Sequence, residues 1–410
     1  MADAHRSDTP SPATPRVVVI GAGLLGGSLI AALQARRFSS DQPLHLTAVS
    51  SASTLAVLRT HAWCDAVFAY DATAEACAGA DLLLLCTPLS TIDAQLQAIG
   101  RIRERLAPDA IVTDVGSTKG AICRVGFAAF PDDEPRSPRF VGGHPMAGSE
   151  KSGIEASDPL LYQSALWVLC PPPDLPSSRL QALQALIRSV GARVALLDPA
   201  QHDAAVARIS HVPQIVASAL ADWAGSDAAL AETSLALAAG GFRDMTRLAL
   251  SSWEIWRDIV ATNNAPIADG LAALAVTFNH LADAARMWPQ PSTGTAGIDG
   301  QPVTDQTSDP ASEFGRTFAG GKAFRQRFRM PRKGIVHDLT EFVVRLSDRP
   351  GELLSLFTPL ANAQINVQDL EILKVREGES GTILLGFATP EDASRARELL
   401  SREGFLIDER

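Results

Sequence analysis

Short apolar runs alternate with segments of helical spacing through the first half of the chain. The clearest candidate strands are Val17–Ile20, Leu44–Val49, Leu82–Cys86, Ile111–Asp114 and Trp167–Cys170. Alternation of strands and helices is typical of βαβ units built around a mainly parallel sheet. Residues 16–197 are therefore predicted to form one α/β domain, preceded by a polar, proline-rich tail over residues 1–15 that we expect to be disordered.

The pattern changes at about residue 198. Strand signals vanish, and alanine- and leucine-rich helical spacing over 198–288 predicts an all-helical domain. Residues 289–337 open with a stretch rich in Pro, Gly, Ser and Thr and are predicted to be a flexible insertion and linker. Residues 338–410 show the order strand, helix, strand, strand, helix, which predicts a small α+β domain.

Composition narrows the function classes. The chain has 36 basic and 46 acidic residues, a net charge of −10, which does not suit a general nucleic-acid binder. Its five cysteines stand singly, without metal-binding spacing, so we expect a reducing compartment and no structural metal. The N-terminus has no apolar leader, and carboxylates interrupt the most apolar stretch, around residues 215–240. A cytoplasmic protein that does not enter a membrane is expected.

A glycine-rich turn follows the first strand. Gly21, Gly23 and Gly26, with Leu24 and Leu25 between them, come after Val-Val-Val-Ile and open an apolar helix. This is the context of the dinucleotide fingerprint, in which glycines let backbone amides approach a pyrophosphate at a helix N-terminus. The sequence predicts a Rossmann-type nucleotide site. A glycine-rich turn without a ligand is the plainer alternative.

The end of the second strand bears on the coenzyme. NAD-binding proteins usually place an acidic residue there to bond the ribose hydroxyls, whereas this chain has only hydroxyl side chains: Ser50, Ser51, Ser53 and Thr54. Without an acid to repel a 2′-phosphate, the sequence slightly favours NADP over NAD. No arginine lies in this loop, so NAD stays open.

Three polar segments stand where strands of an open α/β sheet are expected to end. They are the Thr87-Pro88 turn, a segment around Ser117, and Gly-Gly-His-Pro with His144. Ligands of such sheets bind outside the carboxyl ends of the strands. His144 is expected on a loop, where an imidazole titrating near neutrality can act as a base for a hydroxyl. A histidine that only caps the loop is the alternative.

The helical region contributes further polar groups. His202 and His211 lie nine residues apart, a spacing that puts them on opposite sides of a regular helix and predicts no shared metal ion. Farther on, a Gly-Gly-Phe-Arg-Asp segment contains Arg243, and Arg247 comes soon after it. Arginine binds carboxylates with two charge-assisted bonds, so one of these is a candidate anchor for an acidic substrate. An Arg–Asp ion pair on a solvated helix face explains the same residues.

Together these segments resemble the prephenate dehydrogenase family, which is also met as arogenate or cyclohexadienyl dehydrogenase. The resemblance spans residues 16–288 and rests on five motifs in order: GAGLLGGSL, DVGSTKG, GGHPMAGSEKSG, SHVPQ and GGFRDMTRLALSSWEIWRDI. It implies an NAD(P)-dependent oxidative decarboxylation in tyrosine biosynthesis, carried out by a homodimer whose helical domain pairs the two copies.

The resemblance also implies roles for particular residues. His144 would bond the ring hydroxyl and take its proton, Ser117 would help to orient hydroxyl and nicotinamide, and Arg247 would bind a substrate carboxylate. Further positions that match the family's substrate pocket or its surroundings are Glu150, His211, Gln214, Asp244 and Trp256. Many prephenate-preferring members have a histidine where this chain has Gln214. Prephenate is the expected substrate, with arogenate use or dual specificity as the alternative.

The C-terminal segment resembles the ACT domain. The resemblance covers residues 338–410 and implies an amino-acid effector, tyrosine or a related aromatic, at the positions Asp348, Pro350, Gly351 and Asn366. A purely dimerising role is the alternative. Glycine after proline at a strand-to-helix junction also has a structural explanation, because it relieves the turn.

Two other classes of protein compete with this interpretation. The 3-hydroxyacid dehydrogenases share the architecture but usually employ a lysine on a helix of the second domain, and residues 198–288 contain no lysine. A non-catalytic amino-acid sensor that keeps the nucleotide fold is the other. If the chain were such a sensor, the joint presence of Ser117, His144 and Arg247 would be a coincidence.

Overall fold

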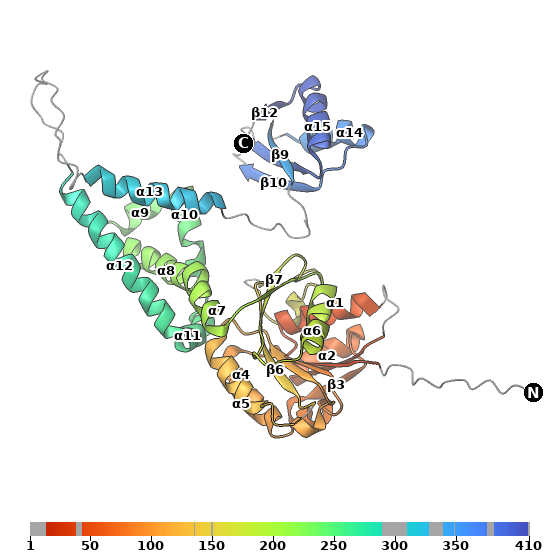
Figure 1. Ribbon diagram of the computed structural model, residues 1–410. Coiled ribbons are helices and arrows are strands. Elements are labelled where there is room, and N and C mark those ends of the chain that lie inside the picture. Colours follow the sequence, from red (N-terminus) through yellow and green to blue (C-terminus); the bar gives the residue numbers. More distant parts are fainter. Residues whose placement is uncertain are drawn as a thin grey trace, which may run out of the picture. The chain divides into compact units, whose positions relative to one another are not determined.

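The computed structural model describes residues 14–37, 43–134, 136–148, 151–288, 310–327, 339–347, 349–374 and 381–408. The chain divides into two compact units, Met1–Arg329 and Met330–Arg410 (Figure 1). Each is described by itself.

An eight-stranded sheet forms the centre of the first unit, in the order β3-β2-β1-β4-β5-β6-β7-β8. Its strands are β1 (Arg16–Ile20), β2 (His45–Ser50), β3 (Ala66–Ala69), β4 (Leu82–Leu85), β5 (Ile111–Asp114), β6 (Arg139–Pro145), β7 (Leu166–Cys170) and β8 (Arg193–Leu196). All neighbours pair in parallel except β6 and β7. The predicted Rossmann-type fold is confirmed. The expected strands are all present, while β3, β6 and β8 are additions.

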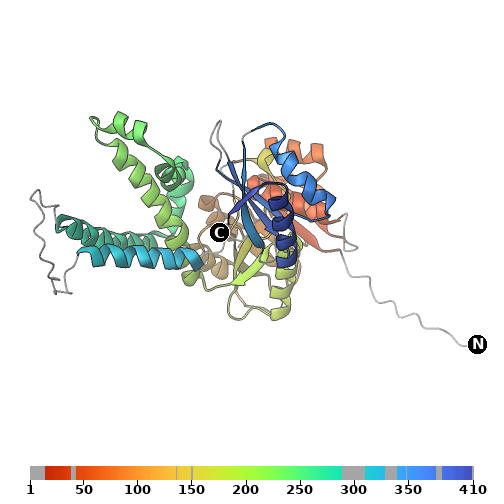
Figure 2. The same cartoon turned by 90° about the horizontal axis from the view of Figure 1, so that it is seen from above.

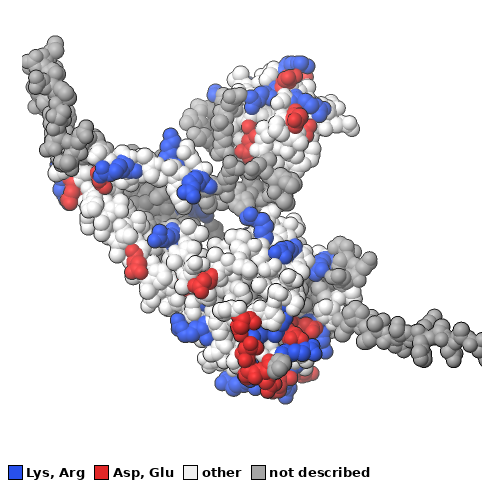
Figure 3. All heavy atoms as spheres, viewed as in Figure 1, with Lys and Arg blue, Asp and Glu red and all other residues white. Residues whose placement is uncertain are grey.

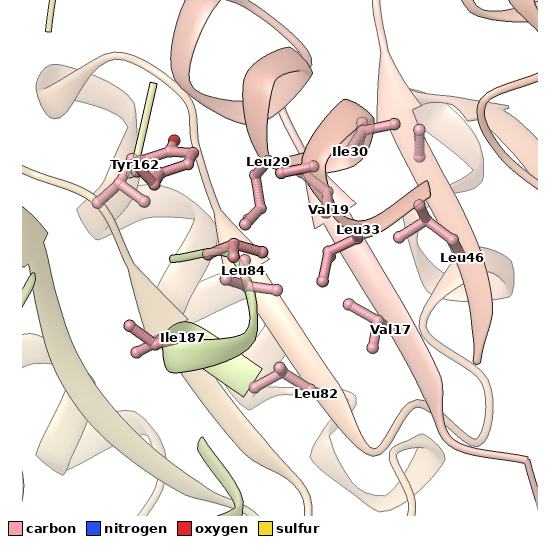
Figure 4. Close-up of a cluster of buried hydrophobic side chains, with 14 of the residues drawn as sticks. Val17, Val19, Leu29, Ile30, Leu33, Leu46, Leu82, Leu84, Tyr162 and Ile187 are labelled. Atoms are coloured by element: carbon pink, nitrogen blue, oxygen red, sulfur yellow. The ribbon is translucent and has the colours of Figure 1, made fainter. Parts of the chain in front are cut away.

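Helices cover both faces of this sheet. They are α1 (Leu24–Arg37), α2 (Ala52–His61), α3 (Thr73–Ala76), α4 (Leu89–Gly100), α5 (Gly120–Ala129) and α6 (Ser177–Ser189), with the short turns η1 (Tyr70–Ala72), η2 (Arg103–Arg105) and η3 (Ile154–Ala156). Because successive strand residues point to opposite faces, Val17 and Val19 pack with Leu29 of α1 in one cluster (Figure 4), while Val18 and Ile20 belong to the other. Burial on both faces explains the unbroken apolar runs.

The rest of the first unit is helical. It contains α7 (Pro199–Val206), η4 (Ala207–His211), α8 (Val212–Gly225), α9 (Ala231–Leu237), α10 (Gly240–Thr246), η5 (Arg247–Leu250), α11 (Trp253–Thr262), α12 (Asn264–Arg286) and α13 (Pro310–Arg327). The helix α13 lies in the segment 289–337 that was expected to be a linker, so that expectation is wrong for residues 310–327. The helix runs beside α12 (Figures 1 and 2), and Phe314 packs edge-on against Trp288 with ring centroids 5.8 Å apart. Residues 289–309 and 328–338 lie outside the described residues.

The helical part carries many exposed large apolar side chains. Leu237, Leu250, Trp253 and Phe278 are among them, and the face drawn in Figure 3 shows mostly uncharged surface over these helices, while charges gather at the lower end of the α/β domain. The stretch Pro199–Gly225 is long and apolar enough to cross a membrane, and 33% of its most apolar 18 residues are buried inside the protein. Its buried polar side chains bond within the protein, which assigns the stretch to the packed domain.

The second unit is a four-stranded antiparallel sheet with two helices. Its elements are β9 (Thr340–Leu346), α14 (Glu352–Asn362), β10 (Asp369–Lys374), β11 (Gly381–Phe387), α15 (Pro390–Arg402) and β12 (Leu406–Asp408), and the strand order is β10-β11-β9-β12. Phe342 and Phe387 stack in its core, 5.2 Å apart. This βαββαβ arrangement confirms the predicted small α+β, ferredoxin-like fold of ACT domains. The short strand β12 is the element that the pattern did not predict.

The segment with His144 differs from expectation. Gly142, Gly143 and His144 were expected on a loop, but they lie in β6, paired with β7. A side chain at Gly142 would collide with the Cys123 sulfur, and one at Gly143 with the carbonyl oxygen of Asp114. The glycines are there because neighbouring groups approach the strand closely, not because the chain turns.

A buried ion pair fixes this strand. The Lys119 ammonium contacts the Asp114 carboxylate, and both side chains are fully buried. Lys119 also donates to the Gly143 carbonyl (2.7 Å), while the Gly143 amide donates to Asp114 (2.9 Å). The two charges thus hold both sides of the backbone next to His144, and Asp114 accepts a further bond from the Gly116 amide (2.8 Å).

Removing one partner of this pair should destabilise the protein strongly. We expect Lys119→Met to lower the free energy of unfolding by about 3–5 kcal/mol, because the Asp114 carboxylate then stays buried without its counter-charge. Arg103→Met is the matched control: Arg103 pairs with Asp133 at the surface, so the loss should not exceed about 1 kcal/mol. Urea unfolding measures both. Equal losses would show that the buried pair does not hold β6.

Candidate active site

The glycine turn lies at the carboxyl end of β1. Gly21 adopts a φ of +92°, a conformation that favours glycine, and a side chain there would meet Thr87 at 2.7 Å. A side chain at Gly26 would overlap the Gly21 carbonyl oxygen. Close packing of the turn against the end of β4 therefore requires both glycines.

Space remains in front of this turn. No heavy atom lies within 4 Å of a Cβ built at Gly23, and α1 begins at Leu24, followed by Leu25. The first amides of a helix and its macrodipole favour an anion at this end. The turn therefore fits the pyrophosphate of a dinucleotide.

The expected coenzyme residues of the neighbouring strands lie around the same turn. The Ala22 amide donates to the Ser50 hydroxyl (3.4 Å), and Pro88 precedes the first turn of α4. At the end of β2 the Ser51 hydroxyl bonds those of Ser53 and Thr54, each at 3.1 Å, on the surface. A hydroxyl cluster thus occupies the place where NAD-binding proteins usually carry an acid.

His144 is joined to the helical domain by its imidazole. Its Nδ1 lies 2.8 Å from Nε2 of His202, and Nδ1 of His202 lies 2.8 Å from the Asp203 carboxylate. His202 and Asp203 are buried, whereas His144 is half-buried. Ser117 lies just beyond the end of β5, the strand parallel to β6, so both expected catalytic residues stand at adjacent strand ends.

The Asp203 carboxylate is itself held by the α/β domain. It accepts the backbone amides of Lys119 and Gly120, each at 2.7 Å. The Asn263 side chain donates to the Asp203 carbonyl (2.9 Å) and lies 3.1 Å from Nδ1 of His211. A connected polar network thus runs from His144 to His211.

The expectation that His202 and His211 point apart is wrong. Between α7 and α8 the segment η4 is π-helical, and the wider turn changes the angular spacing on which that expectation rested. Both histidines therefore reach the Asp203 neighbourhood, and the ring of His211 packs edge-on against Trp256 at 5.9 Å. Both expected pocket residues, His211 and Trp256, lie at this site.

The remaining expected substrate residues lie on and after α8. Gln214 is buried, donates to the Leu248 carbonyl (2.6 Å) and accepts from Ser251 (3.3 Å). It thus holds the turn η5, which begins at Arg247. Arg247 and Asp244 are exposed. Farther along, on α11, Arg257 pairs with its neighbour Asp258 (3.2 Å) at the surface.

Several expected residues fall elsewhere. Glu150 and Asp348 lie outside the described residues. Pro350, Gly351 and Asn366 belong to the second unit, where Gly351 precedes α14 with a φ of +92° and Asn366 borders a cavity of about 440 Å³. These effector positions remain predictions.

Burial sets the charge state of the imidazoles. Desolvation, together with the charge of Lys119, holds the pKa of His144 well below 6.5. Desolvation also lowers the pKa of His211 to about 4. Bonds from His202 and the two backbone amides lower the pKa of Asp203 despite its burial. Near neutral pH, His144 is a neutral imidazole able to accept a proton, and it is linked through His202 to an ionised carboxylate.

Sequence reasoning missed the groups that support His144. His202, Asp203 and Asn263 were not assigned to the site, and Asp114 and Lys119, within the segment around Ser117 that was expected there, were given no role. The signal available was a His-Asp pair within an apolar helical stretch, but its partner is 58 residues away. A surface groove of about 1200 Å³, lined by residues that precede β5 and β6 such as Pro108 and Pro138, contains none of these residues.

Comparison with known proteins identifies both domains that form the site. The profile of the prephenate dehydrogenase nucleotide-binding domain matches residues 45–196, and that of the prephenate dehydrogenase dimerization domain matches residues 198–288.

Similar proteins agree with these matches. The prephenate dehydrogenase of Bacillus subtilis is 26% identical over 94% of this chain and 95% of its own. The cyclohexadienyl dehydrogenase of Zymomonas mobilis is 30% identical over 54% of this chain and 70% of its own. A structure of Aquifex aeolicus prephenate dehydrogenase with hydroxyphenyl propionate and NAD+ superposes with a TM-score of 0.63 and 25% identity over 77% of this chain and 99% of the other. This chain belongs to the prephenate dehydrogenase family of NAD(P)-dependent oxidoreductases.

Proposed function

We propose that this enzyme oxidises and decarboxylates prephenate to 4-hydroxyphenylpyruvate, with NAD(P) as hydride acceptor. One observation carries the proposal. A neutral imidazole, His144, stands at the carboxyl edge of the sheet that also presents the dinucleotide turn, and it is backed by His202 and an ionised carboxylate. That arrangement suits removal of a proton from a hydroxyl whose carbon gives up hydride.

Each part of the site then has a role in the reaction. Gly21, Gly23 and the first turn of α1 bind the pyrophosphate, and bound NAD(P)+ supplies the acceptor for hydride from the hydroxyl-bearing ring carbon. His144 takes the hydroxyl proton as the C–O bond gains double-bond character. Loss of the ring carboxylate as CO₂ makes the ring aromatic, and the proton returns to the phenolic oxygen, so no net proton is consumed. Ser117 orients the hydroxyl.

We propose NADP as the preferred coenzyme over NAD. The surface hydroxyls of Ser51, Ser53 and Thr54 offer hydrogen bonds to a 2′-phosphate, and the end of β2 carries no carboxylate to repel it. The absence of an arginine in that loop is the argument for NAD.

We propose prephenate rather than arogenate as the main substrate. The two differ in the side chain, which is pyruvyl in prephenate and an amino acid in arogenate. Gln214 is neutral, and its amide is already bonded to Leu248 and Ser251, so it supplies no charge that selects an ammonium group. Use of both substrates is the second candidate, and a cyclohexadienyl dehydrogenase among the relatives favours it.

We propose a homodimer formed through the helical domain, and tyrosine as an effector of the second unit. The exposed apolar side chains of α9, α11 and α12 supply a surface of the kind that subunit contacts cover. In the second unit, the positive φ of Gly351 and the cavity beside Asn366 offer backbone amides and room to a small ligand.

Assaying prephenate and arogenate, each with NAD and with NADP, tests the activity. We expect the highest kcat/KM for prephenate with NADP. His144→Asn should lower kcat by roughly 10²–10⁴-fold, the usual contribution of a positioned base, while nucleotide binding, followed by fluorescence titration, is kept. Normal turnover by this variant would remove His144 from the mechanism, and no turnover of either substrate by the wild-type protein would reject the function.

Arg247 is proposed as the anchor of a substrate carboxylate. We expect Arg247→Ala to lower kcat/KM for prephenate by roughly 10²-fold, since a charge-assisted bond to a carboxylate is lost, with the KM for the nucleotide unchanged. Arg257→Ala is the control, because Arg257 is an exposed arginine that pairs with its neighbour Asp258. Equal effects of the two changes would place the anchor elsewhere.

Removing residues 338–410 should separate regulation from catalysis. We expect the shortened enzyme to keep its turnover, because the proposed active site lies in the first unit, and to lose inhibition by tyrosine. Initial rates over a tyrosine titration of both proteins measure this. Inhibition that survives the deletion would locate the effector at the active site.

A further inference from the structure

A buried chain of three side chains leads from the proposed base into the helical domain. It runs from Nδ1 of His144 to Nε2 of His202, and from Nδ1 of His202 to the Asp203 carboxylate, with 2.8 Å at each step. His202 is 1% exposed and Asp203 5%. Both lie on α7, whereas His144 lies on β6, so the chain crosses between the two domains.

The proton positions along this chain depend on its buried end. Asp203 accepts two backbone amides, and its lowered pKa leaves it ionised, so it has no proton to donate. Nδ1 of His202 must therefore carry the hydrogen of the second bond. The 2.8 Å contact between the two imidazoles needs one donor and one acceptor, and the arrangement with a single hydrogen on His202 leaves its Nε2 to accept a hydrogen from Nδ1 of His144. The basic lone pair of His144 is left on Nε2, the nitrogen outside the chain.

The surroundings of His144 oppose its protonation, first by burial and then by nearby groups that are positive or become positive on protonation. Lys119 next to β5 carries a fixed charge, compensated by Asp114, and His211 of η4 faces the same site. The Asp203 carboxylate on α7 supplies the opposite sign, and it reaches His144 through His202. Protonation of His144 therefore depends on His202, which lies between the imidazole and that carboxylate.

We propose that His202 and Asp203 are positioning residues that fix the tautomer of His144 and receive its proton during turnover. The inference rests on the proposed function. When Nε2 of His144 takes the substrate hydroxyl proton, the Nδ1 hydrogen moves to Nε2 of His202. His202 becomes an imidazolium paired with ionised Asp203, and His144 is neutral again beside Lys119. The steps reverse when the phenolic oxygen regains its proton, so every proton is accounted for.

Nitrogen NMR of the intact enzyme labelled with ¹⁵N-histidine tests the arrangement without using activity. We expect both His144 and His202 to carry their hydrogen on Nδ1 near neutral pH, with assignments from the His144→Asn and His202→Gln variants. A His144 with its hydrogen on Nε2 would overturn the proposal, whatever the enzyme's substrate proves to be.

Kinetics of two His202 variants separate orientation from proton transfer. His202→Leu removes the group that accepts the Nδ1 hydrogen of His144. We therefore expect kcat to fall roughly 10²-fold, less than the full loss seen when a catalytic histidine has the wrong tautomer. KM should stay within about twofold, and the acid limb of the kcat/KM profile should move to lower pH. His202→Gln keeps both bonds, through its amide oxygen to His144 and its amide N–H to Asp203, but takes no proton. Its kcat should lie between those of His202→Leu and the wild type.

The control is His45→Gln, the same chemical change at the first residue of β2, the opposite end of that strand from the site. It should leave kcat and the pH profile unchanged. A His202→Leu enzyme with the wild-type pH profile would overturn the relay, as would a His202→Gln enzyme as fast as the wild type. A wild-type enzyme inactive on both substrates would instead reject the proposed function, and the NMR result would stand on its own.

Discussion

One carboxylate holds the site together. Asp203 accepts two amides from the start of α5 and one imidazole from its own helix, so a single buried charge ties the α/β domain to the helical domain and orients His202. A buried ionised carboxylate is costly unless its oxygens are bonded. The oxygens of Asp203 are bonded by two amides of the α/β domain and by His202 of the helical domain. Because the buried charge needs the bond from His202, it also fixes where His202 lies.

The second buried carboxylate, Asp114, has the equivalent function on the other side of His144. With Lys119 it fixes the Gly143 peptide from both its amide and its carbonyl. Burial lowers the pKa of His144 most, and the positive charge of Lys119 lowers it further. A base that is hard to protonate is a weak base, so the site needs a compensating negative group. Asp203 supplies this negative charge through its bond to His202. Asp114 does not, because it is already paired with Lys119.

The sequence was informative where local pattern determines structure. The five predicted strands, the glycine turn and the change to helices at residue 198 were all predictable. β3 and β8 escaped because they are short and partly exposed, and β6 because two glycines in a row look like a turn. The His144–His202 contact joins residues 58 positions apart, and η4 departs from the regular helical spacing used to place His211. Long-range contacts and irregular helices are what periodicity cannot show.

Two departures from regular structure, the paired glycines of β6 and the π-helical segment η4, lie on either side of this polar network. The glycines of β6 let Asp114, Thr113 and Cys123 approach the strand closely, and His144, the next residue, bonds His202 of α7. The π-helical turn changes the angular spacing between α7 and α8, and His211 contacts Asn263, which also bonds the Asp203 carbonyl. A regular helix would bury His202 over the strand and leave His211 apart from Asn263. The chain therefore carries local irregularity on both sides of the site, where packing alone favours regular elements, and functional sites are where such irregularity concentrates.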